Sequence, residues 1–467
     1  MLIRNVEIPE FVGGPPGRVD VRVGSRVEAI GAIAPAEGEV VFDGAGGALL
    51  PGLHDHHIHL FGLAASQDSV DCGPERSLDE VVGDLRAAPG ARVRGINYHE
   101  SLAGELSAAQ IDAWVSDRPV RIQHRTGIVW YLNSAALGEV NAGAADLPGI
   151  ERGADGRPNG RLFRMDEWLS KRLAGAPPDL SRVSAALAAR GITGVTDTTH
   201  TNDDAQARIF CDRIGSAELG QNLRLMGGPG LAGTFEGLVR GEHKIVLDEY
   251  RLPELEGLVR RIRRAHDVER RGVAIHCVTR IELLVALAAL REAGASRADR
   301  LEHASVVPAE SIPEIAGLGV TVVSQPSLVY TRGDRYRADV DVAEHADLYR
   351  AATLMAAGVP YAASSDAPYG DPDPWLSASA AVERKTASGE VLGAAERITP
   401  EAAIGGYLGD PADPASIRRL QVGSPADLCL LDRAWQAAYD NLMAVAVRLT
   451  LRGGRCIHRD HENADTP

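Results

Sequence analysis

The chain has 467 residues, of which 45% are hydrophobic and 24% charged, as in globular proteins of two or three domains or of one large barrel with an appended domain. This composition excludes a disordered or collagen-like chain. Lys and Arg number 49 and Asp and Glu 64, and the formal net charge of −15 argues against nucleic acid or an anionic membrane surface as a partner.

Both ends of the chain have the alternating pattern of short strands. Near the N-terminus the pattern covers 2–8, 19–23, 27–33 and 39–43, and toward the C-terminus it covers 426–432, 446–451 and 453–459. Two strand-rich ends around a different middle predict one small β-sandwich domain built from both termini, residues 1–50 plus 410–467.

The start of the chain lacks the long apolar stretch of a signal peptide, and no apolar run approaches the roughly 20 residues that span a bilayer. The five cysteines are scattered and form no Cys-x-x-Cys pair: Cys72, Cys211, Cys277, Cys429 and Cys456. These features predict a cytoplasmic protein with reduced thiols.

In the middle of the chain, short apolar runs alternate with helical patterns. Amphipathic helices are expected at 252–272 and 281–294, and strands at 47–60, 93–98, 119–124, 191–200, 222–227, 243–249, 273–277, 298–304, 320–326 and 359–368. Such alternation predicts parallel βα units. We therefore expect an α/β fold with a (β/α)8 TIM barrel as the catalytic domain over 51–409.

Metal-capable side chains stand at the ends of several of these strands, and in a barrel those ends converge on one pocket. The first strand ends in four histidines within six residues, 54–59. His57 and His59 are two residues apart and share one face of the strand, from which both rings can reach one ion. His54 and His56 are expected on the other face.

Lys244 lies in the expected strand 243–249 and is one of only three lysines among 49 basic residues. A lysine at a strand end is often only a solvated charge. In this Arg-dominated chain a mere charge would be expected to be Arg, and only an amine can lose its proton and react with carbon dioxide. Lys244 is therefore a candidate for carboxylation, which would make it an anionic ligand able to bridge two cations.

Three more strand ends carry ligand-type side chains: His276, His303 and Asp366. A carboxylate at the last strand can contact a metal and transfer a proton, so Asp366 is also the candidate catalytic residue. Together with the earlier three, these side chains suit two divalent ions that share a water.

The stretch PGLHDHHIH at 51–59 resembles the P-G-x-x-D-x-H-x-H opening of the amidohydrolase superfamily. More closely, the chain is similar to the YtcJ-like branch, amidohydrolase family 3, which includes N-substituted formamide deformylases. The resemblance covers about residues 2–455 and is carried by DGRPNGRLFR (155–164), HKIVLDE (243–249), RLEHASVVPAE (300–310), AAGVPYAASSDAP (356–368) and GSPADLCLLD (423–432).

The resemblance implies a barrel with a β-sandwich from both termini, and a set of metal ligands on numbered strands. The implied ligands are His57 and His59 on strand one, a carboxylated Lys244 on strand four, His276 and His303 on strands five and six, and Asp366 on strand eight. At two positions the sequence departs from the pattern of this branch, and both departures bear on which substrate is bound. Ile128 stands where the branch commonly has the His of D-G-H, and Arg280 where it often has the Asp of H-a-x-G-D.

Such a centre predicts a metal-dependent hydrolase of a small-molecule amide or N-acyl bond, other than a peptide bond, acting through a hydroxide that bridges two metal ions. Zinc is the first expectation, with manganese, iron or cobalt as alternatives. A second hypothesis is a deaminase of a nitrogen heterocycle, although such relatives usually hold one metal and lack the lysine of strand four. A third is a non-catalytic scaffold, which the complete ligand set disfavours.

Four residues are candidates for substrate contacts. Arg125 and Arg164, in expected loops, could clamp a substrate carboxylate, and Gln325 and Tyr330 could line the pocket. The simpler alternatives are surface arginines and ordinary lining residues. The expected partner is a small-molecule amide, and the oligomeric state stays open, a homodimer included.

Overall fold

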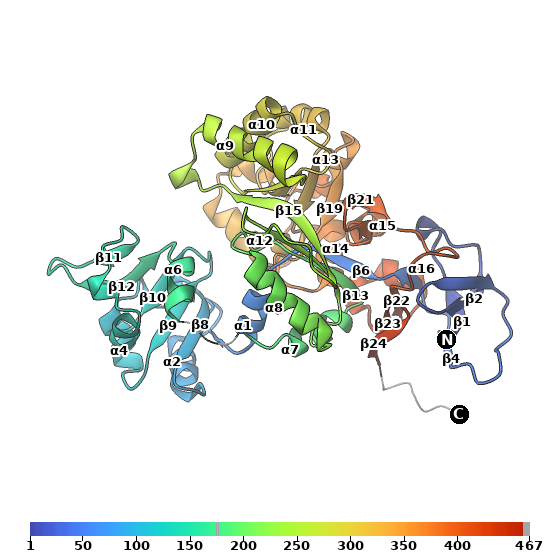
Figure 1. Ribbon diagram of the computed structural model, residues 1–467, viewed down its shortest axis with the longest axis horizontal. Helices are drawn as coiled ribbons and strands as arrows, with labels where there is room; N and C mark the ends of the chain where they lie inside the picture. Colours follow the sequence, from blue (N-terminus) through green and yellow to red (C-terminus); the bar gives the residue numbers. More distant parts are fainter. Residues whose placement is uncertain (174, 176, 461–467) are drawn as a thin grey trace. The chain divides into compact units, whose positions relative to one another are not determined.

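The computed structural model describes residues 1–173, 175 and 177–460 (Figure 1). Its contacts group the chain into two compact units. The first contains Met1–Leu60 and Leu180–Pro467, and the second contains Phe61–Asp179. Each unit is described by itself.

The first unit is built around an eight-stranded parallel sheet. An isolated parallel bridge between Ile58 and Ala367 joins its two edges, so the sheet forms a nearly closed barrel. In order, its strands are β6 (Leu53–Ile58), β13 (Ile192–Asp197), β14 (Asn222–Gly227), β15 (Leu238–Val246), β16 (Val273–Cys277), β17 (Arg300–His303), β18 (Thr321–Ser324) and β19 (Tyr361–Ala363).

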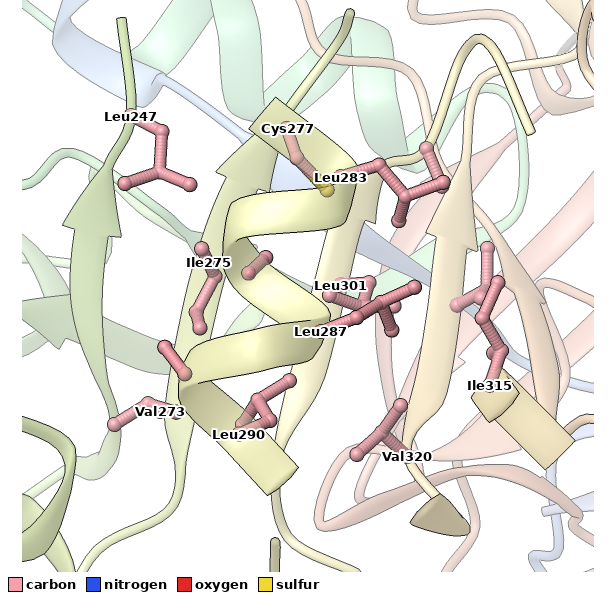
Figure 2. Packing of buried hydrophobic residues seen from close by; sticks show 14 of the residues in the cluster. Leu247, Val273, Ile275, Cys277, Leu283, Leu287, Leu290, Leu301, Ile315 and Val320 are labelled. Atoms are coloured by element: carbon pink, nitrogen blue, oxygen red, sulfur yellow. The ribbon is translucent and has the colours of Figure 1, made fainter. Parts of the chain in front are cut away.

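Helices cover the barrel, and α10 (Arg280–Ala293) shows how they are held. Its N-cap is Thr279, whose side chain forms a capping box with that of Glu282. Figure 2 shows Leu287 of α10 beside Leu301 of β17, in a cluster of buried apolar residues that also contains Leu290. Burying each such leucine contributes about 1.5–3 kcal/mol, so packing holds the helices against the strands.

The other helices of this unit are α7 (Ser181–Ala188), α8 (Asp204–Gly215), α9 (Leu255–Arg264), α11 (Ile312–Leu318), α12 (Ser327–Asp339), α13 (Ala352–Ala356), α14 (Pro374–Glu383), α15 (Pro400–Gly405) and α16 (Trp435–Asp440). Figure 1 shows α9, α10 and α11 on the outer side of the barrel. Among the described residues, no helix is both long and apolar enough to cross a membrane.

Two four-stranded sheets come from the chain ends. One has the order β3 (Val27–Gly31), β2 (Arg18–Val23), β1 (Leu2–Glu7), β4 (Val41–Asp43), and the other has the order β24 (Arg455–Arg459), β23 (Val447–Arg452), β22 (Leu428–Leu431), β5 (Leu49–Pro51). In the second sheet the termini pair directly, since Leu428 lies opposite Pro51. A third, two-stranded sheet pairs β20 (Gly409–Asp410) with β21 (Asp413–Ile417).

The expected fold class, a (β/α)8 barrel with a small β domain from both termini, is confirmed. The predicted boundaries, 1–50 plus 410–467 for the β-sandwich and 51–409 for the barrel, stay a prediction.

The second unit has its own six-stranded mixed sheet, in the order β11 (Ile150–Arg152), β12 (Pro158–Phe163), β10 (Val129–Leu132), β9 (Val120–His124), β8 (Val93–Tyr98), β7 (Val70–Asp71). Its helices are α1 (Leu60–Gln67), α2 (Leu78–Ala87), α3 (Glu100–Ala103), α4 (Ala108–Trp114), α5 (Ser134–Glu139) and α6 (Asp166–Arg172).

Two of the strands expected in the barrel belong to this second sheet. The runs at 93–98 and 119–124 are strands, as predicted, but they form β8 and β9 outside the barrel. Strand pairing makes the difference. β8 pairs with β7 and β9, and β9 pairs antiparallel with β10. The connection between β9 and β10 is too short for the crossover helix that parallel barrel strands need.

Candidate metal centre

The six candidate ligands lie at or near the carboxyl ends of barrel strands. In barrel order these are the first, fourth, fifth, sixth and eighth strands: His57 on β6 and His59 just after it, Lys244 on β15, His276 on β16, His303 on β17, and Asp366 after β19. In the parallel register Val246, two residues after Lys244, pairs with His276, and Cys277 pairs with His303. The strand numbers are those that the resemblance implies.

Three of these side chains offer donor atoms that can share one ion. Those of His57, His303 and Asp366 lie within 4.8 Å of one another, and all three residues are buried. Oδ1 of Asp366 lies 3.4 Å from Nε2 of His57 and 3.4 Å from Nε2 of His59. The ring of His276 lies 4.5 Å from that of His303, between centroids. Imidazoles gathered around a carboxylate form a donor set that suits zinc and similar divalent metals.

Each of three histidines has a further contact through Nδ1. Nδ1 of His57 contacts Oε2 of Glu302, Nδ1 of His59 lies 2.9 Å from the hydroxyl of Thr199, and Nδ1 of His303 lies 2.8 Å from Oε1 of Gln325. Carboxylate and amide oxygens only accept, so Nδ1 of His57 and of His303 carries the proton and Nε2 keeps its lone pair. Such contacts orient histidine ligands in metal sites.

Sequence reasoning missed Glu302 and Thr199. A signal for Glu302 was present, because it is an acidic residue in a short strand that is buried throughout and directly precedes His303. Thr199 follows β13, and its contact with His59 depends on the tertiary fold alone.

Burial sets the protonation of the histidines. It lowers the pKa of His57 and of His276 well below their ordinary value, so both rings are neutral at physiological pH, as metal binding requires. Burial by itself raises the pKa of Asp366, but the hydrogen bond with His59 and the nearby His303 and His57 outweigh it, and the net shift is downward. Asp366 is therefore ionised.

Lys244 is 4% exposed, and its Nζ has no hydrogen-bond partner among the described residues. Burial lowers the pKa of its ammonium group, although the charge of Glu302 opposes the shift. A buried amine whose charged form is disfavoured by burial fits a ligand or a carboxylated lysine. Its carboxylation stays a prediction.

Two of the candidate ligands have unusual backbone. His303 has φ 71° and Asp366 has φ 55°, in the left-handed region that residues other than glycine seldom adopt. The N–H of Asp366 donates to the carbonyl oxygen of His57 (2.8 Å), and Asp55 accepts from the N–H of Ser365 (3.0 Å). These bonds tie the segment after β19 to β6 and hold Asp366 against His57.

The four predicted substrate contacts divide between the two units. Gln325 is fully buried and bonds to His303 and to Ser364, which favours a role in orienting His303. Tyr330 is partly buried on α12. Arg125 and Arg164 follow β9 and β12 in the second unit. Their contacts with substrate stay predictions.

The second unit contains another group of metal-capable residues, His99, Glu100 and His124. Here the backbone N–H groups of Ser101 and Thr126 donate to Nδ1 of the two rings, at 3.0 and 3.3 Å. The ring protons then sit on Nε2, which in each histidine lies 3.1 Å from a different oxygen of Glu100. This hydrogen-bonded set is complete without an ion.

Residues 40–458 match the model of the amidohydrolase family. The chain is 28% identical to an N-substituted formamide deformylase of Arthrobacter pascens, over 89% of each chain, and 26% identical to the YtcJ protein of Bacillus subtilis (strain 168), over 76% of each. The predicted resemblance is therefore confirmed.

Among solved structures, a metal-dependent hydrolase from Pyrococcus horikoshii OT3, described as uncharacterized, superposes with a TM-score of 0.77 at 21% identity. The match covers 98% of this chain and 99% of that one. At this identity the likeness establishes the fold only.

Proposed function

The chain belongs to the amidohydrolase family, and from this premise we propose that it is a metal-dependent hydrolase of a small-molecule amide or N-acyl bond. One observation carries the proposal: the donor atoms of His57, His303 and Asp366 lie within 4.8 Å of one another at the carboxyl ends of the barrel strands. Active sites of such barrels lie at that end.

The residues that would hold the metal are His57, His59, Lys244, His276, His303 and Asp366, with Lys244 carboxylated and two zinc ions as the expected content. When bound, such ions make a water nucleophilic near neutral pH and polarise the substrate carbonyl group. The buried Lys244 amine, with its lowered pKa, supports the carbamate. Its formation joins the nitrogen to the carbon of carbon dioxide and releases one proton.

Asp366 would serve as the proton carrier. The ionised carboxylate lies 3.4 Å from Nε2 of both His57 and His59. The backbone N–H of Asp366 donates to the carbonyl oxygen of His57 and holds the residue in place. The carboxylate would accept a proton as water adds to the carbonyl carbon and deliver it to the leaving nitrogen as the C–N bond breaks. The products are an amine and a carboxylic acid, which loses its proton at neutral pH, and such proton transfer contributes typically about 10²–10⁴-fold to the rate.

N-substituted formamides are the first substrates to test, because one relative is named as their deformylase. Zinc-loaded protein would be incubated with panels of N-formyl, N-acyl and cyclic amides, and released formate or amine measured, with Asp366→Asn as the matched control. We expect turnover of at least one amide class that the control loses. Release of ammonia from nitrogen heterocycles, with one ion per chain and no amide turnover, would instead establish the deaminase alternative.

A further inference from the structure

A chain of buried charges runs through the barrel and ends at the metal centre. Arg224 of β14 makes a two-pronged contact with Glu242 of β15, at 2.8 and 3.2 Å. Nη1 of Arg300, on β17, lies 3.9 Å from Oε2 of that carboxylate, and Nε of Arg300 lies 2.8 Å from Oε1 of Glu302. Oε2 of Glu302 contacts Nδ1 of His57.

Burying these charged side chains costs free energy. Barrel interiors are ordinarily filled by branched apolar side chains. Here Glu302 is 0%, Arg300 1% and Glu242 2% exposed, and each ion taken out of water costs several kcal/mol before its partners compensate. The alternation of cation and anion supplies that compensation. Arg300 is anchored further by donating to the carbonyl oxygen of His56 at 2.7 Å.

We propose that Glu302 is a positioning residue for the metal centre: it holds the proton of His57 on Nδ1, so that Nε2 presents its lone pair toward Asp366. The inference rests on the metal centre of the proposed function and deepens it. Arg300 locates the Glu302 carboxylate, and Glu242 with Arg224 locates Arg300. None of these four residues belongs to the expected set of ligands.

The Glu302 carboxylate does more than pair with Arg300. Arg300 contacts both of its oxygens, with Nε 2.8 Å from Oε1 and Nη2 donating to Oε2 at 3.3 Å. Oε2 also contacts Nδ1 of His57, while Nε2 of the same ring lies 3.4 Å from Oδ1 of Asp366. A structural role predicts lost stability, and a positioning role predicts lost metal affinity.

The test measures zinc rather than turnover. Full-length parent, Glu302→Gln and Glu302→Asp would be freed of metal, and zinc affinity determined by competition with a chromophoric chelator. The visible spectrum of the cobalt(II)-loaded forms would report the ligand geometry. Glu396→Gln is the matched control, because Glu396 is also buried and accepts from Thr353 but lies outside the charge chain. Urea unfolding would follow the stability of each metal-free variant.

We expect both Glu302 variants to bind zinc about 10–100-fold more weakly and to alter the cobalt spectrum, as loss of such partners does in other metal sites. The Glu396 control should stay within about twofold of the parent. Glu302→Asp keeps the charge beside Arg300. If Glu302→Gln does not fold, the zinc affinity and cobalt spectrum of Glu302→Asp alone test the inference. Parent-like affinity and spectrum in a folded Glu302 variant would overturn the inference. A parent protein that binds no zinc would refute the proposed function instead.

Discussion

Replacing Lys244 by Met should have opposite effects on the metal-free and the metal-loaded protein. Nζ of Lys244 is buried and has no hydrogen-bond partner among the described residues, and such a group costs about 1–3 kcal/mol. Met has a similar length and no polar end. In metal-free protein, Lys244→Met should therefore raise the free energy of unfolding by about 1–3 kcal/mol.

In zinc-loaded protein the same substitution removes a proposed ligand. Zinc per chain should fall, and turnover of any substrate found should collapse. Lys244→Arg should lose as much although it keeps the charge, because guanidinium cannot be carboxylated. A short carboxylic acid with bicarbonate should restore part of the activity to Lys244→Ala, where there is space, but not to the arginine variant.

Two measurements check this prediction: urea unfolding of the metal-free variants by circular dichroism, and elemental analysis of the zinc-loaded ones. Lys385→Met is the matched control, since the Lys385 side chain is 53% exposed and pairs with Glu383 at the surface, and its stability should change by less than about 0.5 kcal/mol. The reasoning is refuted if Lys244→Met is less stable than the metal-free parent, or if it retains the parent's zinc content and turnover.

Three further predictions follow from the same residues and from the packing. Asp366→Asn keeps the size of the side chain but loses the proton acceptor, so the initial rate on an accepted amide should fall about 10²–10⁴-fold, and a change of only a few-fold would show that the role is wrong. Burial lowers the pKa of His57 and His276, so as the pH falls below about 6.5 the unfolded chain binds protons before the folded one. Metal-free stability should then decrease from pH 7 to 6, measured by urea unfolding at each pH; unchanged stability contradicts neutral, buried rings. Leu287→Ala opens a cavity between α10 and the barrel and should cost about 2–5 kcal/mol in urea unfolding, without changing the zinc affinity of the folded protein.

The sequence alone was sufficient to predict those features of this protein that depend on the spacing of nearby residues. Two histidines two residues apart at the end of an apolar strand share a face, and the structure has both rings beside Asp366. The alternation of apolar strands with amphipathic helices likewise predicted the barrel, because each such helix must bury its apolar side against strands. α10, with its capping box and buried leucines, is an example.

The tertiary structure decided what depends on distant partners. The runs at 93–98 and 119–124 have the same local pattern as barrel strands, and only their pairing with β7 and β10 assigns them to a second sheet. The contact between His57 and Glu302 joins residues 245 positions apart, and no spacing rule relates them. Local periodicity fixes which face a side chain occupies, but the identity of the group that meets it depends on how the strands close into a barrel.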